Sequence, residues 1–206
     1  MIKKILILVG LIASTSVFAQ ADKFSGFSVG LNTGFSSNTA LYDSNTAASS
    51  TSVEVGRQNT PFNTNVSYVF ALSQSATFGI GMNYDLSKTN FTDKSTSDGI
   101  TFSSSLKNHY SINFEPGYAF NENTLGYFKV AYASGKVDGS NTTKSFSKST
   151  TGTGYGFGMR HLLDKNLFLN SEIYQEKLST ISATLTNAVS FKPTILSATV
   201  GIGYKF

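Results

Sequence analysis

The chain has 206 residues, no cysteine and no tryptophan, and its formal net charge is +4. The lack of cysteine excludes a disulfide framework, and two histidines without cysteine argue against a transition-metal site, so we expect neither metal nor cofactor. Charged residues make up 14% of the chain, against about a quarter in typical soluble domains, and form no basic run that would indicate nucleic-acid binding.

The first nineteen residues predict a signal peptide. Lys3 and Lys4 precede an apolar run over residues 5–13, and a small residue, Ala19, ends the polar stretch that follows. The apolar run is shorter than the about 20 residues that a transmembrane helix needs, which argues against a membrane anchor. We therefore predict a signal peptide at 1–19 and an exported domain at 20–206.

Apolar and polar residues alternate with a period of two in eight segments of the exported domain. In "ATFGIGMNYDL", for example, Ile80, Met82 and Tyr84 share one face, whereas Gly81 and Asn83 share the other. This alternation is typical of strands with one apolar face, so the chain is predicted to be all-β. The eight segments cover residues 27–35, 62–72, 76–86, 108–120, 124–134, 153–160, 167–175 and 197–206.

The connections between these segments also alternate, in length. Three are short, around Gln74, Glu122 and Asp164, and four are long and polar, at 36–60, 87–105, 134–150 and 176–192. Tight turns at one rim and long loops at the other are the pattern of an eight-stranded, antiparallel, up-and-down transmembrane β-barrel, with periplasmic turns and extracellular loops. Asp98-Gly99 and Asp138-Gly139 are hairpin signals inside two of the loops. Leu106 keeps the parity of Tyr110, so the second loop could continue as a strand ribbon above the membrane.

A soluble β-barrel or sandwich is the alternative, because a period of two does not say which face points inward. Three features favour the membrane. The polar parity is rich in Gly, Ser and Asn and carries few Lys/Glu pairs, aromatic residues gather at the strand ends, and the segments have about ten residues rather than five or six. We therefore expect the apolar parity to face lipid and the protein to lie in the outer membrane.

The last segment, "SATVGIGYKF", ends with Ile202, Tyr204 and Phe206 on its apolar face. A sheet in lipid cannot leave an edge unpaired, because no water is present to bond it, so we expect this strand to close against the first. We also interpret these three residues as a C-terminal assembly signal, which makes the outer-membrane assembly machinery an expected partner.

The polar parity is expected to fill the barrel, since eight strands enclose an interior just wide enough for side chains. A hairpin centred on Glu122 puts Glu115 opposite Lys129, and Arg160 and Glu172 become diagonal neighbours. We predict that these two pairs form one interior ionic cluster, which either locks the barrel or gates a narrow pore. The ionisable residues expected inside are His109, Glu115, Lys129, Arg160 and Glu172, with Asp85 and Lys205 as further candidates.

Two local signals refine this picture. Pro116 lies within an alternating segment and lacks the N–H that a ladder needs, so it predicts a bulge. The glycines of "GTGYGFG" recur at every second residue and no helical pattern follows, so we interpret them as the inward face of a strand rather than as a phosphate loop.

Catalytic residues are not expected. Some eight-stranded outer-membrane barrels hydrolyse lipid A with His and Ser near the outer leaflet. Here His161 lies near a periplasmic turn, and His109 and Ser111 point inward by parity. Neither arrangement places a nucleophile beside a base at the outer leaflet, so we predict that the protein is not an enzyme.

The stretches "INFEPGYAFNENTLGYFKVAYASG", "GYGFGMRHLLDKNLFLNSEIY" and "GIGYKF" resemble the small outer-membrane β-barrel family, the OmpA-like and opacity-like "porin family" barrels of Gram-negative bacteria. Glu115-Pro116-Gly117-Tyr118 and Lys129 match the middle hairpin of that family, and Glu172 matches its acidic residue after the sixth strand. Many members have tryptophan at the membrane interfaces, whereas Phe and Tyr would form these girdles here.

The resemblance implies a monomeric, non-enzymatic barrel with a surface-structural, adhesion or loop-mediated recognition role. A narrow diffusion channel for small solutes and a lipid-A-modifying enzyme are the alternatives. The implied partners are outer-membrane lipid, lipopolysaccharide and a host or surface ligand bound by the loops, because loops on a rigid scaffold usually carry recognition.

Overall fold

The computed structural model describes residues 20–45, 50–92, 103–140, 144–184 and 188–206. The predicted signal peptide at 1–19 and the Asp98-Gly99 signal lie outside these residues. Among the described residues, no helix is long and apolar enough to span a bilayer.

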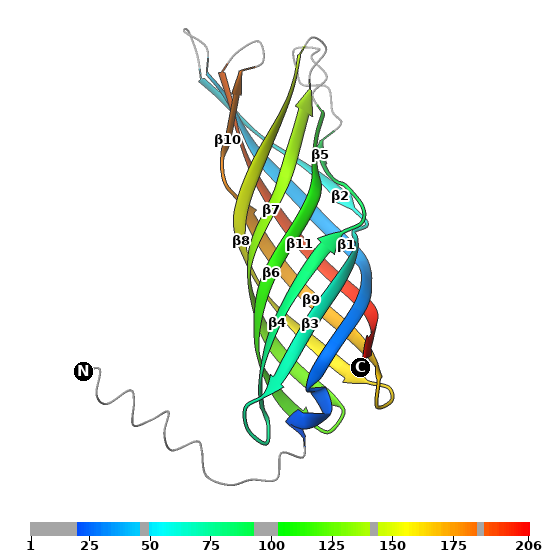
Figure 1. Cartoon of the computed structure of the whole chain (residues 1–206). Coiled ribbons are helices and arrows are strands. Elements are labelled where there is room, and N and C mark those ends of the chain that lie inside the picture. The colour runs from blue at the N-terminus through cyan, green and yellow to red at the C-terminus, as the bar shows by residue number, and fades with distance from the viewer. Residues whose placement is uncertain (1–19, 46–49, 93–102, 141–143, 185–187) are drawn as a thin grey trace, which may run out of the picture.

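Antiparallel strands form a tall barrel with a short 3-10 helix, η1 (Ala21–Phe24), at one end (Figure 1). The first strand pairs with the last over its length, from Ser28↔Lys205 to Asn45↔Ala188, and this pairing closes the ring as expected. The strands are β1 (Gly26–Asn45), β2 (Ser50–Asn59), β3 (Phe62–Ala71), β4 (Ala76–Asp85), β5 (Thr89–Thr92), β6 (Ser103–Asn121), β7 (Thr124–Ser140), β8 (Ser145–Leu162), β9 (Leu167–Leu178), β10 (Ile181–Thr184) and β11 (Ala188–Lys205).

Three of the eight barrel segments are interrupted. β2 and β3 both pair with β1 and are separated at Thr60-Pro61, where proline offers no N–H. β4 and β5 are separated at residues 86–88, and β9 and β10 at residues 179–180. The described strands therefore form eight antiparallel segments, which confirms the predicted barrel. The three short turns, η1 and the C-terminus lie together at one end, called the turn end below (Figure 1).

In their described residues, the predicted long loops are mostly strand, which corrects the expected boundaries. β1 continues ten residues beyond position 35, and β7 and β8 pair up to Ser140↔Ser145. Asp138-Gly139 consequently lies inside β7 rather than at a turn. Serine and threonine suit a strand as well as a loop, and inward apolar residues such as Phe191 add a core that composition alone did not indicate.

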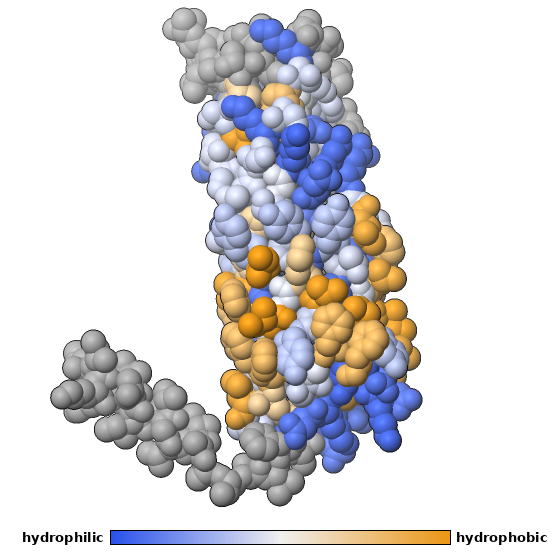
Figure 2. All heavy atoms as spheres, in the orientation of Figure 1, coloured by the Kyte–Doolittle hydropathy of each residue, from blue (hydrophilic) through white to orange (hydrophobic). Residues whose placement is uncertain are grey.

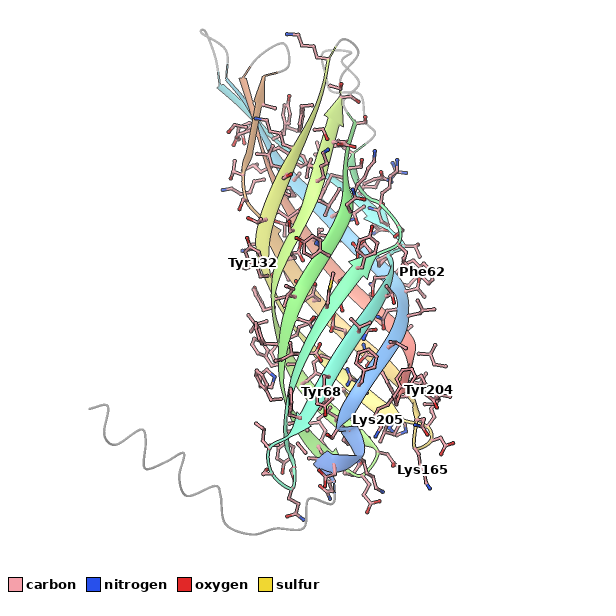
Figure 3. All side chains as sticks on the ribbon, viewed as in Figure 1. Phe62, Tyr68, Tyr132, Lys165, Tyr204 and Lys205 are labelled. Carbon is pink, nitrogen blue, oxygen red and sulfur yellow. The ribbon has the colours of Figure 1, made fainter. Side chains whose placement is uncertain are left out.

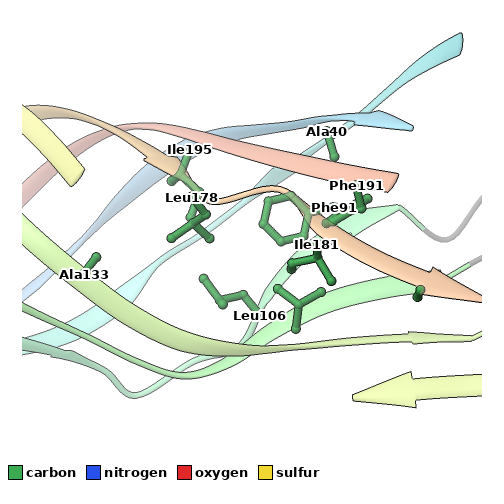
Figure 4. Packing of buried hydrophobic residues seen from close by; sticks show 10 residues of the cluster. Ala40, Phe91, Leu106, Ala133, Leu178, Ile181, Phe191 and Ile195 are labelled. Carbon is green, nitrogen blue, oxygen red and sulfur yellow. The ribbon is translucent and has the colours of Figure 1, made fainter. Parts of the chain in front are cut away.

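Far from the turn end, the barrel separates into two facing sheets of four strands. One sheet has the order β2-β1-β11-β10, and the other has the order β5-β6-β7-β8. Between them lies an apolar core, the upper cluster (Figure 4). It consists of Ala40, Phe91, Leu106, Ala133, Val137, Leu178, Ile181, Ala183, Phe191 and Ile195.

The outer face of the barrel carries an apolar belt nearer the turn end, with hydrophilic residues on either side of it (Figure 2). Phe62, Tyr132 and Tyr204 belong to this face, whereas Lys165 and Lys205 lie at the turn end (Figure 3). The side chain of Phe157 is 67% exposed, whereas the neighbouring Gly156 is buried. This arrangement confirms that the apolar parity faces outward.

A bulge at Asn108 reverses the parity of one strand. The register between β6 and β7 shifts between Lys107 and Tyr110, and Asn108 has a φ of 49°. Leu106 is therefore buried in the upper cluster while Tyr110 faces outward, so the prediction that both share a face was wrong. An extra residue in one strand turns all later side chains to the opposite face.

The bulge predicted at Pro116 is not present. The register between β6 and β7 is the same on both sides, from Phe114↔Val130 to Gly117↔Tyr127, and Phe78↔Pro116 continues the ladder to β4. Glu115 and Pro116 have no ladder partner on β7. The missing donor thus interrupts one ladder locally without an inserted residue.

Candidate functional site

The lumen at the turn end is filled by an apolar group, the lower cluster. It consists of Phe24, Val69, Ala119, Leu125, Leu162 and Phe168. Phe24, from η1, is only 1% exposed. The η1 segment is held in place because the Ala21 N–H donates to the Gln74 carbonyl at 3.0 Å and Lys23 pairs with Glu122. The Lys23 ammonium also lowers the pKa of the Glu122 carboxyl.

Between the two clusters lies an ionic layer. Lys129 Nζ on β7 donates to both carboxylate oxygens of Glu172 on β9, at 2.9 Å each. Arg160 Nη2 on β8 lies 3.6 Å from Glu115 Oε2 on β6. The structure brings the four predicted residues together but exchanges their partners, since the predicted pairs were Glu115 with Lys129 and Arg160 with Glu172.

The glycines of β8 explain the exchange. Lys129 lies opposite Gly156 and Glu172 lies opposite Gly158, so no side chain of β8 separates the ammonium from the carboxylate. The same row accommodates aromatic rings. A Cβ on Gly158 would lie 2.2 Å from Tyr127 Cζ. The interpretation of these glycines as an inward face is confirmed, and what they accommodate is bulk from β7 and β9.

The two tyrosines beside this row extend the polar network. The Tyr127 hydroxyl lies 3.0 Å from Asn170 Oδ1 and 3.0 Å from Glu172 Oε2. The Tyr174 hydroxyl donates to Glu176 Oε2 at 2.9 Å. Both Glu172 oxygens therefore have donors, as a buried carboxylate requires.

His109 forms a second ionic group on the side nearer the upper cluster. Its Nδ1 lies 2.8 Å from Asp85 Oδ2, and its Nε2 lies 2.8 Å from Glu176 Oε1. A carboxylate only accepts, so both ring nitrogens donate and the ring is an imidazolium. The prediction missed Glu176 because it assigned residues 176–192 to a loop. The inward parity of Asn170, Glu172 and Tyr174 continues to Glu176 and was the available signal.

The ionic layer encloses a cavity of about 60 Å³. A single water needs about 10–15 Å³ of such volume, so this cavity can hold only a few waters. Lys205 is not in the layer, because its Nζ donates to the Lys23 carbonyl at the turn end. Among the described residues, no group of three or more His, Cys, Asp or Glu could hold a metal ion.

The C-terminal residues lie at the closure of the barrel. The Phe206 N–H donates to the Phe27 carbonyl at 2.9 Å, and the rings of Phe27 and Phe206 lie 5.7 Å apart between centroids. Ile202 pairs with Leu31 and Tyr204 with Val29. The role of these residues as an assembly signal stays a prediction.

Comparison with known proteins identifies the family. The model for the outer membrane protein beta-barrel domain matches residues 5–206. The chain belongs to this family. Its place is therefore the cell outer membrane, and the resemblance seen in the sequence is confirmed. For this outer-membrane barrel, no significant match was found among curated proteins.

Several solved structures are similar to the barrel. Ail, the attachment invasion locus protein of Yersinia pestis, is 19% identical with a TM-score of 0.48, over 88% of this chain and 99% of that chain. Neisserial surface protein A is 14% identical with a TM-score of 0.45, over 88% and 98%. The outer membrane protease OmpT of Escherichia coli is 9% identical with a TM-score of 0.49, over 95% and 100%.

Proposed function

We propose that this outer-membrane barrel is a closed, non-enzymatic protein with a surface-structural, adhesion or recognition role. The observation that carries the proposal is the layering of its lumen. The lower cluster fills the turn end and the upper cluster fills the opposite part, with the ionic layer between them. The cavity of about 60 Å³ in this layer has room for a few waters and lies between the two apolar clusters.

The part beyond the apolar belt supports a role at the surface. The two four-stranded sheets lie beyond the outward-facing Tyr132, which is near the edge of the belt (Figures 2 and 3). A rigid scaffold that presents polar side chains in water suits recognition. The exposed lysines of this part include Lys107, Lys136, Lys144, Lys148, Lys177 and Lys192, and they are compatible with phosphate groups of lipopolysaccharide or with an acidic surface ligand.

Conduction and catalysis are the two alternatives. A diffusion channel would have to displace side chains of both clusters as well as the ion pairs, and breaking a buried pair is costly. For catalysis, His109 has both ring nitrogens on carboxylates, which leaves no free base. His161 Nδ1 lies 3.1 Å from Thr124 Oγ1, but this pair is exposed at the turn end, away from the outer leaflet.

Planar-bilayer recordings test the closed lumen. We expect no steady current from the wild-type protein, nor from Phe24→Ala, because the ionic layer and the upper cluster still fill the lumen when this turn-end ring is removed. Steady wild-type currents would favour the channel. Altered lipid A in the mass spectrum of an expressing strain, compared with a deletion strain, would favour the enzyme.

Cell binding tests the surface role. Cells that express the barrel should adhere to immobilised lipopolysaccharide or extracellular-matrix protein more than deletion cells do. Equal adhesion on every surface tested, by cells with the same amount of folded barrel, would contradict the recognition role.

A further inference from the structure

The two sheets beyond the belt leave a seam between β8 and β10. The ladder between β8 and β9 begins at Gly152↔Leu178, and the part of β8 before it pairs only with β7. β10 pairs only with β11. Each of these two strands therefore has one paired edge and one edge that faces the seam (Figure 1).

The backbone groups that face the seam can be assigned. The Thr151 carbonyl accepts a bond from the Ser179 N–H at 2.7 Å, so the main chain of Thr151 points toward the seam. In an antiparallel strand, alternate residues direct both backbone groups to the same side. Ser145, Ser147 and Ser149 therefore direct their N–H and C=O groups into the seam, and no backbone bond joins them to the described part of β10.

A lysine crosses the seam in place of a ladder. Lys148 Nζ donates to the Ser182 carbonyl at 2.6 Å, and Thr150 Oγ1 lies 3.3 Å from the Ser179 carbonyl. Lysine is common on exposed edge strands, because its flexible charged side chain disfavours pairing with another strand. Here the Lys148 ammonium is bound to a neutral carbonyl. A carboxylate can displace that carbonyl, because charge-assisted hydrogen bonds are stronger.

The charge around the seam is mainly positive, although Asp138 on the neighbouring β7 accepts a bond from Ser147. Neither β8 nor β10 contains an acidic residue, whereas Lys148 and Lys177 are both exposed. The nearest described carboxylate on β7, Asp138, already has Lys107 at 2.7 Å. The seam therefore favours an acidic partner over a basic one.

We propose that the seam admits an extended peptide strand that pairs with the β8 edge and carries a carboxylate for Lys148. The inference rests on the proposed surface role and names a site and a partner class for it. The edge from Ser145 to Thr151 spans about 20 Å at strand geometry, enough for a short β-addition. Main-chain bonds to the three serines give affinity, and the carboxylate of the peptide replaces the Ser182 carbonyl at Lys148.

Amide exchange on the mature barrel in lipid nanodiscs tests the pairing. The probe is a capped peptide of about eight residues in which valine and threonine alternate around one central glutamate. Addition of this peptide should slow exchange at the Ser147 and Ser149 amides by about tenfold or more at saturation. The same peptide with lysine in place of glutamate should protect these amides less.

Substitutions then separate backbone pairing from other binding. Ser147→Pro and Ser149→Pro each remove an N–H that faces the seam and should abolish protection at the remaining serine amide. Ser147→Ala and Ser149→Ala keep the N–H and are the matched controls, expected to bind the peptide normally. If the proline variants do not fold, peptides N-methylated at alternate residues serve the same purpose with the wild-type barrel. The peptide methylated at the residues whose N–H groups point to β8 should protect less than the peptide methylated at the residues in between.

Three results would overturn the proposal. The first is that the glutamate peptide gives no protection, and the second is that both proline variants are protected as strongly as the wild-type barrel. The third is a barrel dimer formed through the same seam, which would make the occupant a second copy of the chain. Surface adhesion that survives the proline variants would refute the seam alone. Peptide protection in a barrel that conducts steadily, or that adheres to nothing, would refute the proposed function alone.

Discussion

Lys129 on β7 bonds to Glu172 on β9 across the intervening β8 strand, at 2.9 Å from each carboxylate oxygen. The contact passes over glycine positions of β8, so one ion pair on the lumen side joins two strands that are not neighbours in the sheet. Because the pair is buried, the loss of one partner should destabilise the barrel by more than the intact pair stabilises it.

Removal of Lys129 alone should strongly lower the stability of the barrel. Lys129→Met leaves the Glu172 carboxylate buried without its cation, and we expect the free energy of unfolding in lipid vesicles to fall by about 3–5 kcal/mol. The double variant Lys129→Met with Glu172→Gln should recover most of this loss, because no buried charge is then unpaired. A double variant as unstable as the single one would contradict this account.

The glycine row should not tolerate a methyl group. In Gly158→Ala the new Cβ would meet the Tyr127 ring, whose hydroxyl bonds would be displaced, and we expect a loss of about 1–3 kcal/mol. Gly56→Ala in the exposed β2 is the control, since its nearest heavy atom would be 3.3 Å away and a change within about 0.5 kcal/mol is expected. Equal unfolding energies for the two variants would show that Tyr127 is free to move.

The two histidines should respond differently to the same substitution. His109→Phe leaves Asp85 and Glu176 facing an apolar ring, and we expect a loss of about 3–5 kcal/mol at neutral pH. His161→Phe changes an exposed residue and should stay within about 0.5 kcal/mol. Equal losses in the two variants would show that Asp85 and Glu176 do not depend on His109.

The Lys107–Asp138 pair, in water beyond the belt, should matter little. The Lys107 ammonium, with a bond from Ser147, lowers the pKa of Asp138. The carboxyl is thus more acidic in the folded protein, so its contribution is present above its unfolded pKa and lost as the pH falls through its folded pKa. Asp138→Asn should cost less than about 1 kcal/mol at pH 7, and the difference should shrink as the pH falls through the folded pKa of Asp138. A larger cost, insensitive to pH, would point to a packing role.

Much of the lumen could be anticipated from parity alone. The inward placement of Glu115, Lys129, Arg160 and Glu172 follows from period two and from one hairpin centre, both of which are local. The register that puts Glu115 opposite Lys129 is the one observed, since Phe114 pairs with Val130. The partner of Lys129 could not be read in this way, because it depends on free space above a glycine of a third strand.

The sequence by itself determined the outward apolar face, the eight-segment order, the turns and the closing strand, because alternation and turn residues act over a few positions. Only the tertiary structure decided the ion pairing, the bulge that buries Leu106, and the apolar core beneath residues that had read as polar loops. These features depend on contacts between strands distant in the chain, and local propensity carries no information about which side chains those strands bring together.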